Sequence, residues 1–258
     1  MPNARDLELN EAGWWSHWTD VRWVGANAYI LLSSSFEEYF FNRAGFVDCR
    51  GSREAIPKIE ADFEAAGQPP CFSVKEKCKE AANALVSRGY TAFDGMAVMQ
   101  LGRPRFRTAA GLTVLSGQDI SAADWAAAYS LSFYDDFRTR DSVSLIAERL
   151  RKEPSVTLVA GMKEGKVAGI LAAFRTRGLL GVYCIGTLNK YRMMGVAGSL
   201  IHEAKKMASA EGRELILQTI VSDEVEDYYL RGGFRRLYLK QLMRRESSAL
   251  SLQGKRRV

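Results

Sequence analysis

The amino-acid sequence predicts an α/β fold built from two tandem repeats. Apolar runs typical of strands alternate with amphipathic runs typical of helices, and the same order of elements occurs twice. The 258 residues are enough for one large domain or two small ones. Hydrophobic residues make up 47% and charged residues 26% of the chain, which is close to the globular average and excludes a mostly disordered or fibrous protein.

The first repeat is expected to contain strand, strand, helix, strand, helix and strand. Gly67 ends the first of these helices, and two prolines precede the third strand. The expected bounds are 29–34, 39–47, 53–66, 71–74, 76–88 and 91–101.

The second repeat opens with two helices and a β-hairpin. A charged turn containing Gly165 joins the hairpin strands, which is the usual hairpin signal. A further strand, a long helix ending near Gly212, a buried-type strand, a short helix and a last strand follow. The expected bounds are 121–137, 141–152, 156–161, 167–174, 179–188, 195–210, 215–220, 223–230 and 234–244.

The spacing of glycines supports a duplication. Gly67 and Gly89 are 22 residues apart, and Gly212 and Gly233 are 21 residues apart. The offset between the repeats is therefore about 145 residues, typical of a divergent tandem repeat. We expect domains at 1–105 and 108–246, joined by a short polar Gly/Pro linker, and a basic tail at 247–258.

The net charge of +6 is concentrated at one end. Residues 243–258 carry four of the six excess positive charges, so the body of the chain is nearly neutral. Nucleic-acid binding is therefore not expected, although a contact between the tail and a polyanion stays open as an alternative. No apolar run is long enough for a membrane helix, and the first eight residues do not predict a signal peptide.

The expected location is therefore cytoplasmic, with all four cysteines reduced. The cysteines form no C-x-x-C pair and the chain has two histidines, so no metal site is expected.

One segment stands out as an anion cradle, at the turn from the strand 179–188 to the helix 195–210. Gly195 and Gly198 have no Cβ, so a ligand could approach the backbone closely. The first-turn N–H groups of a helix have no intrahelical partner, and the helix dipole makes that end positive. Arg192 adds a formal charge, so the predicted guest is a pyrophosphate. The turn lacks both the dinucleotide-binding and the P-loop glycine patterns.

The turn does match R-x-x-G-x-A, as Arg192 to Ala197, and in this it resembles the GNAT superfamily of acyl-CoA-dependent N-acyltransferases. Tyr229 to Phe234 matches the family's Y-x-x-x-G-F, and Asn189 stands where the family commonly has proline. The resemblance covers about residues 110–245. It implies two tandem acyltransferase-like domains, each a mixed, mostly antiparallel sheet flanked by helices. It also implies acetyl-CoA as co-substrate, bound by Thr187, Leu188, Arg192, Met193, Met194, Gly195, Val196, Ala197, Gly198 and Ser199.

The resemblance implies direct attack of a primary amine on the thioester in a ternary complex. Tyr229 would protonate the leaving thiolate, and a backbone N–H near Thr187 or Leu188 would stabilise the developing oxyanion. The strand 179–188 carries no carboxylate, so the sequence identifies no general base. The candidates are Asp135, Asp136, Asp141, Asp223 and Glu224, each more typical of a solvated or capping acid; His17, His202 and Cys184 are expected to be structural.

The first repeat is expected to be a degenerate copy without cofactor chemistry. At the offset of the cradle, residues 47–53 read Val-Asp-Cys-Arg-Gly-Ser-Arg, with one glycine and an aspartate, and Leu85 replaces the tyrosine. The predicted activity is N-acetylation of an amine acceptor, either a small molecule or a peptide N-terminus or lysine. The rival is a non-catalytic acyl-CoA sensor. The oligomeric state, including a homodimer, stays open.

Overall fold

The computed structural model describes residues 2–245, and the predicted tail at 247–258 lies outside them. Contacts divide the described chain into two compact units. Unit 1 holds the residues up to Val98 together with 220–222 and 237–245, and unit 2 holds 99–219 and 223–236. The last strand of the chain therefore supplies most of its residues to unit 1. The proposed division into domains at 1–105 and 108–246 stays a prediction about the repeats.

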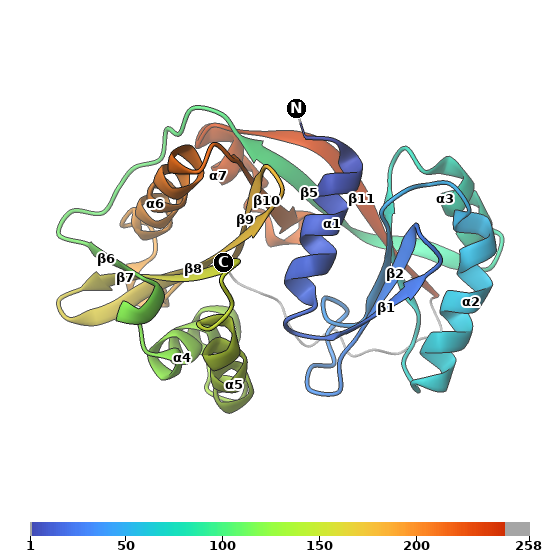
Figure 1. The fold of residues 1–258 in the computed structure, drawn as a ribbon, viewed down its shortest axis with the longest axis horizontal. Coiled ribbons are helices and arrows are strands. Elements are labelled where there is room, and N and C mark those ends of the chain that lie inside the picture. Colours follow the sequence, from blue (N-terminus) through green and yellow to red (C-terminus); the bar gives the residue numbers. More distant parts are fainter. Residues whose placement is uncertain (1, 246–258) are drawn as a thin grey trace. The chain divides into compact units, whose positions relative to one another are not determined.

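Unit 1 is a mixed sheet covered by helices (Figure 1). Its strands run in the order β1-β2-β3-β4-β11-β5. The pairs β1–β2, β2–β3 and β4–β11 are antiparallel, and β3–β4 is parallel. The elements are α1 (Ala4–Trp15), β1 (Asp20–Val24), β2 (Ala28–Leu32), β3 (Arg43–Phe46), α2 (Ser52–Ala65), β4 (Cys71–Lys75), α3 (Lys79–Val86), β5 (Tyr90–Leu101) and β11 (Phe234–Arg245).

The core of unit 1 lies between the sheet and helices α2 and α3. Helix α2 buries Ile56, Ile59 and Phe63 on one face, which follows from their helical spacing. These side chains pack in one cluster with Phe46 and Phe72 from the parallel strands β3 and β4. Burial of this apolar face is the main force that holds α2 against the sheet.

Unit 1 also contains a buried ion network. Lys240 of β11 contacts two carboxylates of α1, and all of these side chains are at most 1% exposed. Arg43 of β3 binds one of the same carboxylates at 2.6 Å, and Tyr238 donates a 2.7 Å hydrogen bond to the other. We define the buried ion network as Glu8, Glu11, Arg43, Tyr238 and Lys240.

Unit 2 has helices on both faces of its sheet, with α6 opposite α4 and α5 (Figure 1). The strands run in the order β10-β9-β8-β7-β6, with β9–β10 parallel and the other pairs antiparallel. The elements are β6 (Thr113–Ser116), α4 (Ala122–Phe133), α5 (Arg140–Leu150), β7 (Val156–Lys163), β8 (Lys166–Thr176), β9 (Leu179–Thr187), α6 (Val196–Ala210), β10 (Glu214–Ile220) and α7 (Glu226–Arg231).

The predicted fold class is confirmed, and the element order repeats as expected. Three strands, a helix, a strand, a helix and a strand occur as β1 to β5 with α2 and α3, and again as β7 to β11 with α6 and α7. In each set the long helix connects two parallel strands. The elements α1, β1 and β6 were not predicted from the sequence.

The prediction that all four cysteines stay reduced is wrong. Cys49 and Cys78 form a disulfide, with their Cα atoms 5.3 Å apart. Cys49 lies just before α2 and Cys78 just before α3, so the fold brings together two residues 29 positions apart. Cys71 and Cys184 are not disulfide-bonded.

Two findings hold for residues 2–245. None of the helices combines the length and the apolar character needed to cross a bilayer. In the same part of the chain, no group of three or more histidine, cysteine or acidic side chains is arranged to hold a metal ion.

Candidate active site

The predicted cradle is the turn between β9 and α6. A one-turn 3-10 helix (Asn189–Tyr191) leads into it, and Gly195 is the residue immediately before the helix. Gly195 has φ +85° and Met193 has φ +61°, so the turn needs left-handed backbone at two positions, one of them a non-glycine. Met193 is 94% exposed.

The two glycines of the turn have a structural reason that the sequence did not reveal. A Cβ on Gly195 would lie 2.7 Å from the backbone of Thr108, and one on Gly198 would overlap the carbonyl oxygen of Arg107. Ala109 donates its N–H to Ser199 Oγ at 2.9 Å. The space directly beside the glycine Cα atoms is therefore filled by the chain's own segment 106–109.

In its C-terminal half, strand β9 is no longer regularly paired with either neighbour, β10 or β8. Its pairing with β10 extends only to Val182 and Leu217. On the other side, the β8 register shifts around residues 184 and 185, where Cys184 has φ +52°. Such a bulge turns backbone groups out of the ladder. By contrast, the Leu188 N–H donates to the Ala168 carbonyl at 3.0 Å, so it is already engaged.

Two buried polar atoms near this irregular part of β9 have no hydrogen-bond partner among the described residues. Gln218 Nε2 belongs to β10, one residue beyond the last pair with β9. Ser132 Oγ belongs to α4, and a Cβ on Gly186 would lie 2.9 Å from it. Buried polar atoms are nearly always paired, so these two indicate where a ligand's polar groups could bind. Sequence reasoning missed both; the one signal was a glutamine that interrupts the apolar strand at 215–220.

Tyr229 lies in α7 and is 8% exposed. Its ring packs edge-on against Phe234 at 5.6 Å and against Tyr228 at 5.5 Å. Burial raises the pKa of Tyr229, and Tyr228 and Asp223 raise it further. Burial also raises the pKa of Tyr228 to about 12. The Tyr229 hydroxyl therefore stays protonated at neutral pH, so it is suited to donate a hydrogen bond and not to accept a proton.

The candidate bases are mostly engaged by neighbouring groups. Asp135 accepts a 2.8 Å hydrogen bond from Asn189, so the residue in the place of the family's proline is tied to this carboxylate. Asp136 pairs with Arg138 at 3.3 Å, and Asp141 lies in the first turn of α5. Of the acids before α7, Glu224 has φ +58° and Asp223 lies at the end of a one-turn 3-10 helix.

Each of the two histidines contacts groups of the surrounding fold. His202 Nε2 contacts the Phe106 carbonyl at 3.3 Å, and the His17 ring lies 6.3 Å from that of Trp14. The contacts of Asp135, Asp136, Asp141, Asp223 and Glu224 described above do not distinguish one of them as a general base.

In the second half, α6 connects the parallel strands β9 and β10, and the turn before α6 carries the R-x-x-G-x-A motif. Residues 125–246 match the family model of the acetyltransferase (GNAT) domain. The second half of the chain is thus a GNAT domain, which confirms the resemblance seen in its motifs. No curated protein matches the sequence.

Solved structures resemble the whole fold at low sequence identity. A GCN5-related N-acetyltransferase from Kribbella flavida is 18% identical with a TM-score of 0.71, and the match covers 97% of this chain and 98% of that one. One from Sphaerobacter thermophilus is 18% identical with a TM-score of 0.66, covering 85% and 76%. A tandem GNAT protein from the clavulanic acid biosynthesis pathway is 12% identical with a TM-score of 0.58, covering 84% and 77%. These likenesses concern the fold, and they agree with a tandem arrangement.

Proposed function

We propose that the second repeat transfers an acetyl group from acetyl-CoA to a primary amine. The observation that carries this proposal is the family turn at residues 192–197, between strand β9 and helix α6. The unpartnered amide of Gln218 supports it, because an acyl-CoA tail carries amide oxygens that could accept its hydrogen bonds. Acetyl-CoA, when bound, supplies the activated acyl group as a thioester.

The turn would hold the diphosphate through the backbone N–H groups of residues 193–198 and the dipole of α6. Arg192 Nε donates to the Thr187 carbonyl at 3.4 Å, and this tethers a positive charge beside the turn. The glycines contribute by letting segment 106–109 pack against α6, which fixes the start of the helix.

The backbone N–H that stabilises the oxyanion was expected near Thr187 or Leu188, but we propose a different position for it. The Leu188 N–H is bound to Ala168, whereas the bulge at residues 184 and 185 directs backbone groups out of the ladder. We therefore assign the oxyanion-stabilising amide to this bulge. A preorganised N–H of this kind contributes about 3 to 4 kcal/mol to the transition state.

Tyr229 would donate a hydrogen bond to the sulfur as the thiolate leaves. Because burial raises the pKa of Tyr229, we expect stabilisation by the donated hydrogen bond more than complete proton transfer. Tyr229→Phe should lower kcat about 100-fold and leave acetyl-CoA affinity nearly unchanged. Tyr228→Phe is the matched control, since that ring is adjacent and 37% exposed. Wild-type kcat in Tyr229→Phe would reject the role.

The direct test of the function measures release of the coenzyme A thiol in the presence of a panel of amines. We expect amine-dependent release, and calorimetry should give one acetyl-CoA per chain because the first repeat lacks the motif. Binding without thiol release for every amine class would favour the rival function, a non-catalytic acyl-CoA sensor. Absence of acetyl-CoA binding would reject both functions.

A further inference from the structure

Unit 1 contains a small cavity between the β1–β2 hairpin and the start of α2. Its volume is about 150 Å³, and it is lined by residues 24–28, Phe46, Arg50, Gly51, Ser52 and Ala55. We call this cavity the turn pocket. This is far less than the ~300 Å³ at which pockets for drug-sized ligands begin. The turn pocket is therefore the size of a single charged group with a short substituent.

The start of α2 forms one wall of the turn pocket. Gly51 has φ +70° and immediately precedes the 14-residue helix, and this repeats the left-handed glycine found before α6. The Ser52 N–H already donates to the Cys49 carbonyl at 3.3 Å, so the N–H groups of Arg53 and Glu54 are the first-turn amides left for an anion, which the helix dipole favours there. The degenerate repeat has thus kept the backbone geometry of an anion-binding helix start.

A buried hydroxyl points independently to a ligand. Ser52 is 1% exposed and lines the turn pocket, and its Oγ has no hydrogen-bond partner within residues 2–245. A hydroxyl removed from water without a partner is unfavourable and rare in native proteins. A ligand with acceptor oxygens in the pocket would satisfy it.

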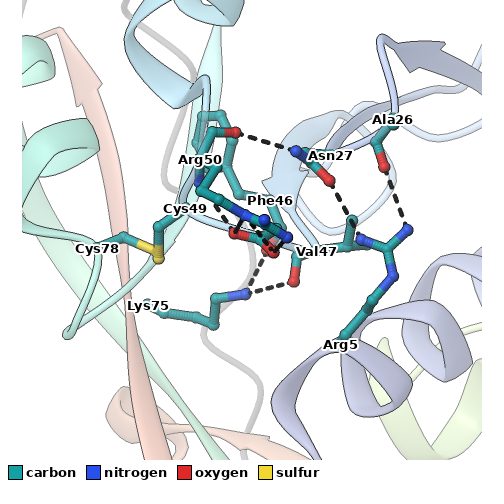
Figure 2. Close-up of polar contacts among 10 residues, drawn as sticks. Arg5, Ala26, Asn27, Phe46, Val47, Cys49, Arg50, Lys75 and Cys78 are labelled. Atoms are coloured by element: carbon teal, nitrogen blue, oxygen red, sulfur yellow. Dashed lines mark hydrogen bonds and ion pairs between the residues drawn. A yellow bond between two sulfur atoms is a disulfide. The ribbon is translucent and has the colours of Figure 1, made fainter.

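Three cationic side chains, Arg5, Arg50 and Lys75, lie near the turn (Figure 2). Arg50 pairs with Asp48 at 2.8 Å, and Arg5 donates to Asn27 at 3.2 Å. Lys75 donates to the carbonyl groups of Phe46 and Val47 at 2.7 and 3.0 Å, directly beside the turn.

The Lys75 ammonium interacts electrostatically with Asp48 and also with Glu8, Glu11 and Lys240 of the buried ion network. The Asp48 carboxylate is occupied by the Arg50 guanidinium and by the Arg50 backbone N–H at 3.0 Å.

The turn is also fixed in place before any ligand binds. The Cys49–Cys78 disulfide ties it to the start of α3, and Asn27 Nδ2 donates to the Arg50 carbonyl at 3.2 Å from the opposite hairpin (Figure 2). Preorganisation of this kind reduces the entropic cost of binding.

We propose that the turn pocket binds a phosphate group, through the backbone N–H groups of Arg53 and Glu54, the Ser52 hydroxyl and Arg50. The ligand is a free phosphate ion or a small phosphate monoester. The site lies entirely within unit 1 and does not depend on the acetyltransferase function of unit 2.

The test titrates the ¹⁵N-labelled full-length protein with inorganic phosphate at constant ionic strength. We expect saturable amide shifts at residues 51–54. Shifts at residues 193–198 report separately on the α6 turn, so failure of one site is distinguishable from failure of the other. Absence of saturable shifts at residues 51–54 would overturn the proposal.

Two serine variants make the test specific. Ser52→Ala should weaken binding about 10- to 100-fold, as expected for loss of a hydrogen bond to a charged group, and should not lower Tm because the hydroxyl has no protein partner. Ser73→Ala is the control: this serine is 2% exposed and its Oγ also lacks a partner in the described chain, but it lies outside the pocket. Wild-type affinity in Ser52→Ala, or an equal loss in Ser73→Ala, would overturn the proposal.

A final titration distinguishes the two sources of the phosphate group. Tighter binding of glycerol phosphate than of inorganic phosphate supports a phosphorylated small molecule as the ligand. The reverse order supports the free ion, and each order retains the site. If phosphate shifts the amides of residues 193–198 and leaves those of residues 51–54 unchanged, it binds only at the α6 turn, and the proposal is contradicted.

Discussion

Replacing Lys240 with methionine tests the buried ion network of unit 1. Lys240 is fully buried, and its ammonium group contacts Glu8 at 3.4 Å and also binds Glu11. Methionine fills a similar volume without the charge. Removing one partner of a buried ion pair typically costs about 3 to 5 kcal/mol, because the other partner stays buried without compensation.

The remaining charges set the expected value within that range. Without Lys240, Glu11 still contacts Arg43 at 2.6 Å, and Glu8 still interacts with the charge of Lys75. Burial raises the pKa of Glu8, although Lys240 opposes this, so loss of Lys240 lets Glu8 take up a proton. We therefore expect a loss near the low end, about 3 kcal/mol, a large part of the 5 to 15 kcal/mol typical of a domain.

A second substitution should restore the balance. In the double variant Glu8→Gln/Lys240→Met, Glu11 and Arg43 remain as one neutral pair, and Tyr238 can still donate to the amide oxygen. We expect this variant to regain more than half of the lost stability. Recovery of this kind is a coupling energy, which is measured by a double-mutant cycle.

The assay is urea unfolding followed by tryptophan fluorescence at neutral pH. Four of the five tryptophans, at positions 14, 15, 18 and 23, belong to unit 1, so the signal reports mainly on that unit. Lys206→Met is the control, because this exposed lysine pairs with Glu203 at the surface and should cost less than about 1 kcal/mol. A Lys240→Met protein within 1 kcal/mol of wild type, or a double variant no more stable than the single one, would refute the reasoning.

Three further predictions follow from other features. Cys49→Ser should lower the free energy of unfolding by about 3.6 kcal/mol, the chain-entropy value for a 29-residue loop, and an unchanged urea midpoint would contradict it. Met193→Asp should weaken acetyl-CoA binding in calorimetry while Met193→Asn does not, because both tolerate the left-handed backbone and only aspartate adds a negative charge at the turn; equal affinities would reject the cradle. Burial opposes ionisation of Glu11, but Lys240 and Arg43 outweigh it and lower the pKa of Glu11 to about 2, so wild type should lose stability as pH falls from 4.5 towards 2. A Glu11→Gln protein with the same pH slope would show that this carboxyl does not contribute.

The sequence predicted the repeated elements because their signals are local. The helix α6, for example, follows from the glycines around residues 195 and 212 and from the helical spacing of its apolar residues. Helix α1 was missed because Glu8 and Glu11 would be expected on an exposed face, whereas both are buried. The cations that make this burial possible lie far along the chain, and periodicity within one segment does not detect such partners.

The candidate site divides in the same way. The turn and Tyr229 follow from motifs, and each lies in the expected element. The reason for Gly198 could not be predicted, since it depends on contact with a segment about 90 residues earlier in the chain. The Cys49–Cys78 pairing likewise depends on how α2 and α3 approach each other, and the spacing of 29 residues carries no known signature.

The contribution of β11 to unit 1 has a consequence for the order in which the chain can fold during its synthesis. β5 ends at Leu101, but unit 1 is complete only when residues 237–245 have been added. At about 5 to 20 residues per second, the ribosome needs roughly 7 to 30 s to make the intervening stretch. Throughout that interval, β4 has no partner strand on the side that β11 will occupy. The carboxylates of α1 also lack their ion pair with Lys240, which has not yet been synthesised. Unit 1 is therefore synthesised first but can complete its fold only after the rest of the described chain has been made. A nascent chain halted near residue 105 would expose an unpaired strand edge to other proteins in the cell.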